Sequence, residues 1–167
     1  EDVDLGELEE AAGQIAEFEE KTIFQGLDKA CIKGLKGESA HKALKFPDEP
    51  QEILKTLTDA IGTMKKSFVE GPYHLVVGKD KWQQLMTHTG GYPLRKQLEK
   101  LIDGQIILNH YIDEGYLVSG RGGDFSLVLG QDLSIGYESH TQKEVQLYIT
   151  ESFTFRVLEP AAVVVFE

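Results

Sequence analysis

Residues that commonly carry chemistry are sparse in this chain, and their spacing matches no familiar catalytic or metal-binding pattern. The five histidines lie far apart, so no two of them have the four-residue helical spacing at which histidine pairs hold zinc. The single cysteine, Cys31, has no second thiol for a disulfide or a thiolate metal site, which is typical of proteins in a reducing cytoplasm. We therefore predict neither a metal site nor a cofactor.

Acidic pairs are the remaining candidates for acid–base catalysis. They are Glu9–Glu10, Glu19–Glu20 and Asp113–Glu114, and each occupies neighbouring positions that we expect to face solvent. No serine stands in the glycine-flanked turn that exposes the nucleophile of many hydrolases. We predict that the chain is not an enzyme, and a pair of carboxylates brought together only by the fold is the alternative left open.

A glycine pair before an acid, in the stretch RGGDFSLVLGQDLSIGYE at residues 121–138, has the look of a phosphate-binding loop. A Walker loop, however, needs a lysine and a hydroxyl residue after its last glycine, and a dinucleotide-binding loop must open a helix. Here Asp124 and Phe125 lead into alternating apolar and polar residues, the pattern of a strand. The stretch therefore predicts two sheet segments, 125–129 and 133–137, joined by a bend at Gly130.

The negative charge of the chain is concentrated at its start. The formal net charge is -11, and residues 1–20 contain nine acids and no base. These acids suit a solvated helix face and the positive end of a helix dipole, and docking to a basic partner is the alternative. Because no basic patch is present, we predict no nucleic-acid partner. No apolar run approaches the roughly 20 residues that span a bilayer, so we predict no membrane partner.

Hydrophobic periodicity places helices early in the chain and strands late. The pattern predicts helices over 4–26, 48–68, 80–88 and 94–102, with residues 27–46 as loop and the HTGGYP segment, 88–93, as an exposed turn. It predicts strands over 72–78, 105–108, 116–119, 125–129, 133–137, 145–149, 152–158 and 161–166. This order indicates a mixed α+β fold rather than alternating units around a parallel sheet.

Five long, ungapped stretches resemble the encapsulins, bacterial and archaeal shell proteins once described as linocin-type bacteriocins. They are AEFEEKTIFQG at 16–26, EGPYHLVV at 70–77, GGYPL at 90–94, RGGDFSLVLGQDLSIGYE at 121–138 and ITESFTFRVLEP at 149–160. The similarity spans nearly the whole chain and keeps the family's order.

The resemblance implies the major-capsid fold of tailed phages. In that fold a peripheral domain holds a long spine helix and a sheet, and an axial domain is inserted into it. Residues 1–38 and 126–167 would then be peripheral and residues 39–125 axial, with the glycine pair near the return between them. Full-length family members have a longer N-terminal part that carries the arm and the extended loop. We therefore expect this chain to be N-terminally truncated and to assemble poorly by itself.

The resemblance also implies a function and its partners. Encapsulins assemble with themselves into icosahedral cytoplasmic nanocompartments and enclose a cargo enzyme, such as a ferritin-like iron oxidase that serves iron storage or a dye-decolourising peroxidase. A C-terminal peptide of the cargo binds the inner face of the peripheral domain. Leu133, Ile135 and Tyr137 are candidates for part of that apolar docking surface, and a strand face buried in the core is the alternative.

In encapsulins the turn that matches HTGGYP lines the five-fold pore. The implied pore residues are His88, Thr89, Gly90, Gly91, Tyr92 and Pro93. The paired glycines allow a tight turn, and a ring of His88 side chains would make the pore charge depend on pH. A plain loop between two helices is the alternative interpretation.

Two other functions remain open at this point. A phage or prophage major capsid protein would share the fold, although the near balance of charge beyond residue 20 gives little to neutralise a packaged genome. A bacteriocin or protease, as in older descriptions of the family, is the other alternative. The sequence offers no nucleophile with a neighbouring base to support it.

Overall fold

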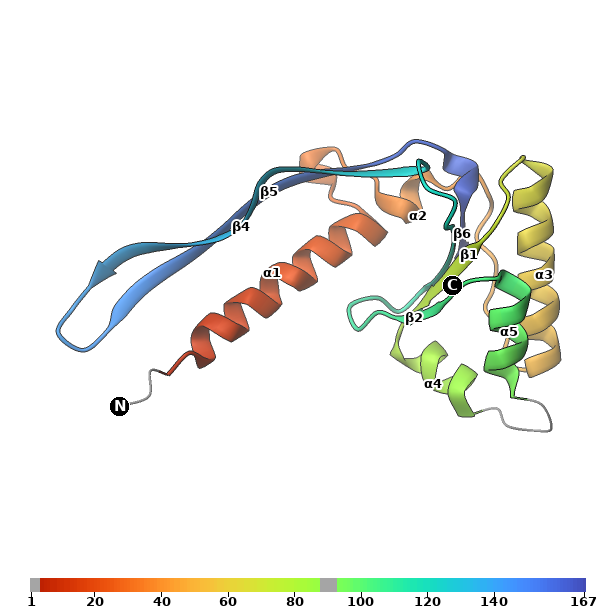
Figure 1. Ribbon diagram of the computed structural model, residues 1–167, viewed down its shortest axis with the longest axis horizontal. Helices are drawn as coiled ribbons and strands as arrows, with labels where there is room; N and C mark the ends of the chain where they lie inside the picture. The colour runs from red at the N-terminus through yellow and green to blue at the C-terminus, as the bar shows by residue number, and fades with distance from the viewer. Residues whose placement is uncertain (1–3, 88–92) are drawn as a thin grey trace.

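A long arm extends from a more compact part in the computed structural model, which describes residues 4–87 and 93–167 (Figure 1). The helices are α1 (Gly6–Gln25), α2 (Gly34–Glu38), α3 (Pro50–Lys66), α4 (Lys79–Thr87) and α5 (Leu94–Ile102), with short 3-10 turns at Asp28–Ala30 and Pro160–Ala162. The strands are β1 (Tyr73–Val77), β2 (Ile106–Leu108), β3 (Gly115–Ser119), β4 (Phe125–His140), β5 (Val145–Val157) and β6 (Val163–Phe166). The predicted α+β composition is confirmed.

The first helix begins and ends where its sequence signals lie. The Asp4 carboxylate accepts a hydrogen bond of 3.0 Å from the amide of Gly6, the first residue of the helix. The cap position itself is Leu5, whose side chain has no acceptor atom. The helix ends at Gly26, whose φ of 95° lies in the region that favours glycine. A Cβ there would stand 2.6 Å from the carbonyl oxygen of Lys33, so the following segment packs directly against the helix end.

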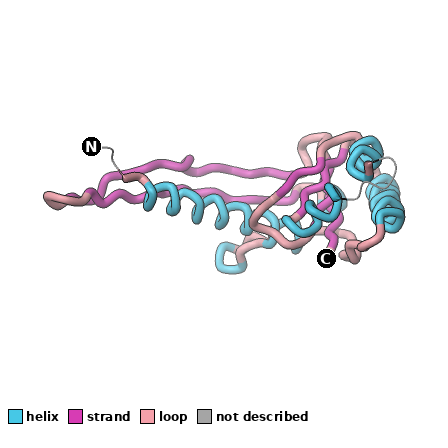
Figure 2. The backbone as a smooth tube through the Cα atoms, turned by 90° about the horizontal axis from the view of Figure 1, so that it is seen from below, coloured by secondary structure: helices cyan, strands magenta, loops and turns pink. Residues whose placement is uncertain are grey.

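The arm consists of α1 lying beside a two-stranded ribbon made of β4 and β5 (Figures 1 and 2). The strands pair antiparallel from Phe125 opposite Val157 to His140 opposite Val145. The four segments predicted at 125–129, 133–137, 145–149 and 152–158 are thus two continuous strands. Register shifts on either side of Gln131 take up the extra residues as bulges, which bend a strand without ending its pairing.

The compact part is built on a sheet with the strand order β2-β1-β3-β6 in the described chain. β1 and β2 run parallel, while β3 is antiparallel to both of its neighbours, β1 and β6. One face packs on α3, α4 and α5 through Leu75, Leu117 and Phe166. The other face packs on the end of α1, on α2 and on the start of the ribbon through Tyr116 and Val165. Burial on both faces explains the continuous apolar runs of β1 and β6.

The end of the chain returns to this sheet. β6 pairs with β3, and its outer edge is held by the segment before α3, where the Leu44 amide donates to the carbonyl of Val165 and the Glu167 amide donates to the carbonyl of Leu44. Part of the predicted 27–46 loop is therefore extended and bonded. The division predicted from sequence groups residues 126–167 together, whereas the strand pairing joins β6 to the same sheet as β1. That domain division stays a prediction.

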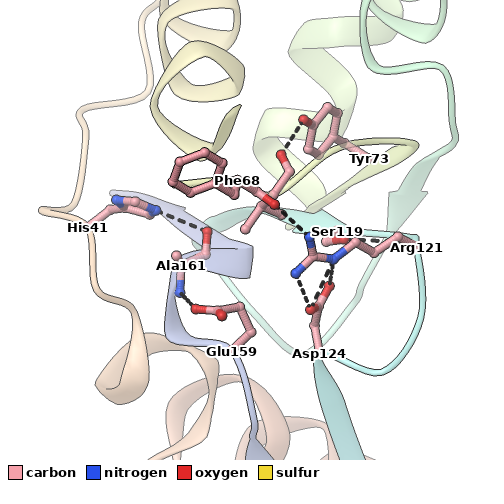
Figure 3. Close-up of polar contacts among 9 residues, drawn as sticks. His41, Phe68, Tyr73, Ser119, Arg121, Asp124, Glu159 and Ala161 are labelled. Carbon is pink, nitrogen blue, oxygen red and sulfur yellow. Dashed lines mark hydrogen bonds and ion pairs between the residues drawn. The ribbon is translucent and has the colours of Figure 1, made fainter. Parts of the chain in front are cut away.

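A short turn connects the sheet to the arm (Figure 3). Gly122 and Gly123 have φ values of 84° and 83°, and no atom lies within 4 Å of where a Cβ would be, so the backbone conformation alone calls for glycine. The Arg121 guanidinium donates to the Asp124 carboxylate and, at 2.8 Å, to the carbonyl oxygen of Phe68 at the end of α3. The turn leads directly into β4, as the sequence predicts, and is fastened to the compact part by a side chain.

Candidate docking surface on the arm

The three residues predicted to dock a peptide lie on one face of β4. Leu133, Ile135 and Tyr137 alternate along the strand, and their side chains are 49%, 58% and 57% exposed. Ile135 stands opposite Ile149 and Tyr137 opposite Leu147 on β5. The structure therefore brings the three residues together on an open apolar surface, and none of them belongs to either hydrophobic core.

Toward the compact part, α1 lies beside this face of the ribbon and covers it only in part. A shallow hollow lies between the helix and the ribbon, and its lining combines apolar and acidic side chains: Ala12, Ile15, Ala16, Glu19, Leu127, Leu129, Asp132, Leu133 and Glu151. Phe18 and Phe153 pack edge to face beside it, with ring centroids 6.3 Å apart. We call this hollow, together with the open face of Ile135 and Tyr137, the arm groove. The residues predicted from sequence, Leu133, Ile135 and Tyr137, lie on its ribbon side, and the helix side was not predicted.

Large apolar side chains are exposed along the arm groove. Seven large side chains on the two strands of this face are exposed, namely Leu127, Leu129, Leu133, Ile135, Tyr137, Val145 and Leu147. Continuous apolar patches of this kind mark interaction sites, because each exposed side chain forfeits its transfer free energy. A two-stranded ribbon by itself is also only marginally stable, so a binding partner would add to the stability of the arm.

The groove carries an acidic rim. Glu19, Asp132 and Glu151 come from α1, β4 and β5 respectively, and no ion pair joins any of them to a basic residue of the described chain. Partial burial of Glu151, followed by the charges of Glu19 and Asp132, raises the pKa of its carboxyl. The charges of Glu19 and Asp132 thus act against the charge of Glu151, and no ion pair with the described residues offsets this.

The tip of the ribbon is ordered by local contacts. The Tyr137 hydroxyl and His140 Nδ1 share a hydrogen bond. A Cβ at Gly136 would stand 2.1 Å from the Tyr148 ring, so the glycine makes room for the ring across the strand pair. The Thr141 hydroxyl accepts from the amides of Lys143 and Glu144 and closes the turn between the strands.

The predicted pore segment lies between α4 and α5. His88, Thr89, Gly90, Gly91 and Tyr92 are outside the described residues, and only Pro93 is placed, as the residue that caps α5. The flanking helices are joined by the Arg95 guanidinium, which stands 6.0 Å from the centre of the Trp82 ring. The assignment of this segment to a pore stays a prediction.

A second polar cluster lies where α1, α2 and the chain end meet. Lys36 pairs with Glu114 at 3.0 Å and with Glu167 at 3.2 Å, and the Gln25 amide donates to Glu114 at 3.1 Å. Burial alone would raise the pKa of the Glu114 carboxyl, but the hydrogen bonds from Lys36 and Gln25 hold it below its usual value. The cluster links α1, α2 and the chain end through the Glu114 carboxylate and the Lys36 ammonium. No group of three potential metal ligands occurs within 4–87 and 93–167.

Known proteins resemble this chain in sequence and identify its family. A sequence profile of the family described as "Encapsulating protein for peroxidase" matches residues 1–154. The chain belongs to the encapsulin family. A Type 1 encapsulin shell protein of Rhodospirillum rubrum is 41% identical over 165 residues, which are 98% of this chain and 59% of the relative. One from Mycobacterium tuberculosis is 39% identical over 155 residues, 92% of this chain and 58% of the relative.

Solved structures share the fold. The virus-like particle protein of Pyrococcus furiosus superposes with a TM-score of 0.75 at 22% identity, over 92% of this chain and 64% of that one. A Mycobacterium phage Che8 protein superposes with a TM-score of 0.72 at 12% identity, over 99% of this chain and 63% of that one. The resemblance seen in the sequence and the capsid-type fold are both confirmed. This encapsulin chain spans about three fifths of the length of the curated relatives.

Proposed function

We propose that this encapsulin chain is a structural shell subunit. It would assemble with copies of itself into a closed icosahedral compartment in the cytoplasm, and the compartment would enclose a cargo enzyme. Family membership supports the class of function, and the observation that carries the proposal is the arm, which holds a continuous apolar face away from both cores. Such a face is costly in a monomer and is expected of a subunit that is completed by other chains.

The two parts of the molecule suit the proposed peripheral and axial division. Residues 1–38 and 126–167 would form the peripheral domain, which corresponds mainly to α1, α2 and the ribbon. Residues 39–125 would form the axial domain, which corresponds to β1, β2 and β3 of the sheet and to α3, α4 and α5. The pairing of β6 with β3, and the hydrogen bonds from the Leu158 and Glu159 amides to the Asp124 carbonyl, would then join the two domains.

The arm groove is the proposed site for the cargo peptide. Leu133, Ile135 and Tyr137 would supply apolar contacts along an extended segment, and the hollow beside α1 would accept a side chain at one end. The cargo would be a ferritin-like iron oxidase or a peroxidase, and the family description, encapsulating protein for peroxidase, favours the second. The segment His88–Pro93 would line the pore through which small substrates reach the enclosed enzyme.

On this proposal the subunit works by binding and geometry, without catalysis of its own. The likeness to a phage protein extends to the fold, whereas relatives about 40% identical carry the encapsulin name, so a shell for an enzyme is favoured over a shell for a genome. Among the described residues no helix is both long and apolar enough to cross a bilayer.

The deciding experiment expresses the protein from its gene's own start codon and measures native mass and negative-stain images of the purified product, with the 167-residue chain in parallel. Closed particles of uniform diameter from the complete product are expected. A stable monomer of the complete product at high concentration would mean that the likeness conveys the fold without assembly.

A further inference from the structure

We infer that Phe68 of one subunit inserts its side chain into a pocket beside α2 of a second copy of this chain. The pocket lies between residues 31–38 and the end of β5, and we call it the α2 pocket. It shares no lining residue with the hollow of the arm groove. The inference rests on the proposed function, because it specifies one contact between copies of the shell subunit.

Phe68 is the most exposed large apolar side chain of the described chain, at 88%. It directly follows the last turn of α3, and its φ of 60° lies in the left-handed region. Glycine or asparagine takes this conformation with little strain, whereas a bulky side chain rarely adopts it. Local stability therefore explains neither the residue type nor its exposure.

The backbone of Phe68 is held from both sides. Its amide donates to the carbonyl of Lys65 at 3.0 Å, and the Val69 amide donates to the carbonyl of Met64 at 3.0 Å, which together form a Schellman motif. The Val69 and Met64 side chains are buried in the core, and Arg121 donates to the Phe68 carbonyl. Figure 3 shows the ring projecting away from the guanidinium. The ring is thus presented to solvent at a fixed position, as an aromatic anchor of an interface would be.

The α2 pocket suits an aromatic side chain. Its volume is about 190 Å³, below the roughly 300 Å³ at which pockets for small molecules begin, so one side chain fits it better than a small-molecule ligand. Phe155 and Val157 line it with apolar surface, and Cys31 adds a polarisable sulfur of the kind that contacts aromatic rings favourably. Lys33 and Arg156 supply cations, which are attracted to the face of a ring.

The charges beside the two surfaces are complementary. Glu70 lies two residues after Phe68, its side chain is 71% exposed, and its ion pair with Lys65 is long, at 3.8 Å. Arg156 of the pocket has no ion pair with the described residues. Insertion of the Phe68 ring would bring Glu70 close to Arg156, and this pair would fix the orientation of the contact.

A second copy is the partner because a single chain leaves both surfaces unoccupied. No lining residue of the α2 pocket comes from α3, and the exposure of Phe68 shows that its ring lies outside the pocket of its own chain. A subunit that offers an anchor on one surface and a pocket on another joins its copies head to tail, and such contacts can close into rings. The proposed icosahedral shell is built from rings of this kind.

Site-specific crosslinking of the complete gene product tests the contact. Ser67 adjoins Phe68 and is exposed, so Ser67→Cys places a thiol beside the anchor and retains the ring. The partner thiol is Cys31, which is exposed in the pocket. After treatment of the purified product with a short bismaleimide, denaturing electrophoresis should show covalent dimers or longer multiples of the chain.

Three further variants assign the crosslink. Ser67→Cys combined with Cys31→Ser lacks the pocket thiol and should give no product above background. Gln51→Cys places an exposed thiol at the opposite end of α3, about 24 Å away at roughly 1.5 Å per residue, and should also give none. Phe68→Asn added to Ser67→Cys removes the ring and keeps a residue that tolerates the left-handed conformation. It should lower the crosslinked fraction about 5-fold or more.

Each outcome separates the inference from the function on which it rests. Uniform particles in negative-stain images with no crosslink in Ser67→Cys would overturn the Phe68 contact and leave the shell function intact. Equal crosslinking of Gln51→Cys, or a yield that Phe68→Asn does not change, would also overturn it. A complete product that stays monomeric would contradict the shell function and the inference together.

Discussion

Arg121 and Asp124 form a close ion pair across the glycine turn, with 2.7 Å between Nη2 of the guanidinium and Oδ1 of the carboxylate. Asp124 is 5% exposed, and its backbone carbonyl also accepts hydrogen bonds from the amides of Leu158 and Glu159 after β5. Because Arg121 reaches Phe68 as well, this one pair connects α3, the turn and both strands of the ribbon. It lies where the proposed domains meet.

The first prediction concerns acid stability. The hydrogen bonds from Arg121 hold the pKa of the Asp124 carboxyl below its ordinary value of 3.8 despite burial. A lowered folded-state pKa stabilises the fold in full above about pH 4, and this contribution is lost as the pH falls through the lowered value. Asp124→Asn should therefore unfold about 1–3 kcal/mol more easily at neutral pH, since it leaves the guanidinium without its charged acceptor.

Urea unfolding of both proteins, from neutral pH to below about pH 3, measures this difference. The gap in unfolding free energy should narrow as the pH falls, because protonated Asp124 resembles asparagine. All other carboxyls are common to the two proteins and cancel in the comparison. A gap that stays constant with pH would contradict an ionic contribution.

The second prediction separates the effect of backbone conformation on stability from the effect of steric crowding. Gly123→Ala should cost about 1–2 kcal/mol, because φ of 83° places an alanine in the left-handed region although nothing lies near its Cβ. Gly13→Ala, also with free space but within α1, should gain about 0.5–1 kcal/mol from the higher helix propensity of alanine. Thermal unfolding of the two variants measures both effects, and equal shifts in the same direction would refute the conformational explanation.

The parts of the fold that sequence predicts well are those with a strong period. α3 and α5 follow from apolar residues at helical spacing, and β1 follows from a short apolar run between glycines. α2 was predicted as loop because its five residues include two glycines. It forms through tertiary contact, since Ile32 and Leu35 pack with Phe155 of β5 in one core. Local helix propensity cannot predict that contact, because it lies far away in the sequence.

The candidate site was also predictable only in part from the sequence. Alternation along β4 places Leu133, Ile135 and Tyr137 on one face from sequence alone. The acidic rim was not predicted, because Glu19 and Glu151 are brought together only by the packing of α1 on the ribbon. The register shifts beside Gln131 decide which side of β4 faces the helix there, and bulges of this kind have weak sequence signals.

The third prediction compares two buried tyrosines. The Tyr116 hydroxyl is buried without a hydrogen-bond partner among the described residues, and burial raises the pKa of its phenol. The Tyr73 hydroxyl donates to the carbonyl oxygen of Val69 at 2.8 Å. Tyr116→Phe should raise the unfolding free energy by about 1 kcal/mol, and Tyr73→Phe should lower it by about 1 kcal/mol. Loss of stability in Tyr116→Phe would show that the hydroxyl has a partner in solution, such as a bound water.

The last prediction tests the arm groove without disturbing the fold. Ile135→Ser should change the unfolding free energy by less than about 0.5 kcal/mol, because the side chain is 58% exposed. It should weaken binding of a fluorescein-labelled peptide of alternating leucine and serine about 10-fold, since a bound segment would remove that side chain from water. Val128→Ser is the matched control, because Val128 is also exposed on β4 but faces away from the groove. Anisotropy titrations that show equal weakening in both variants would place peptide binding elsewhere, whereas a selective loss in Ile135→Ser ties binding to the face that the strand register defines.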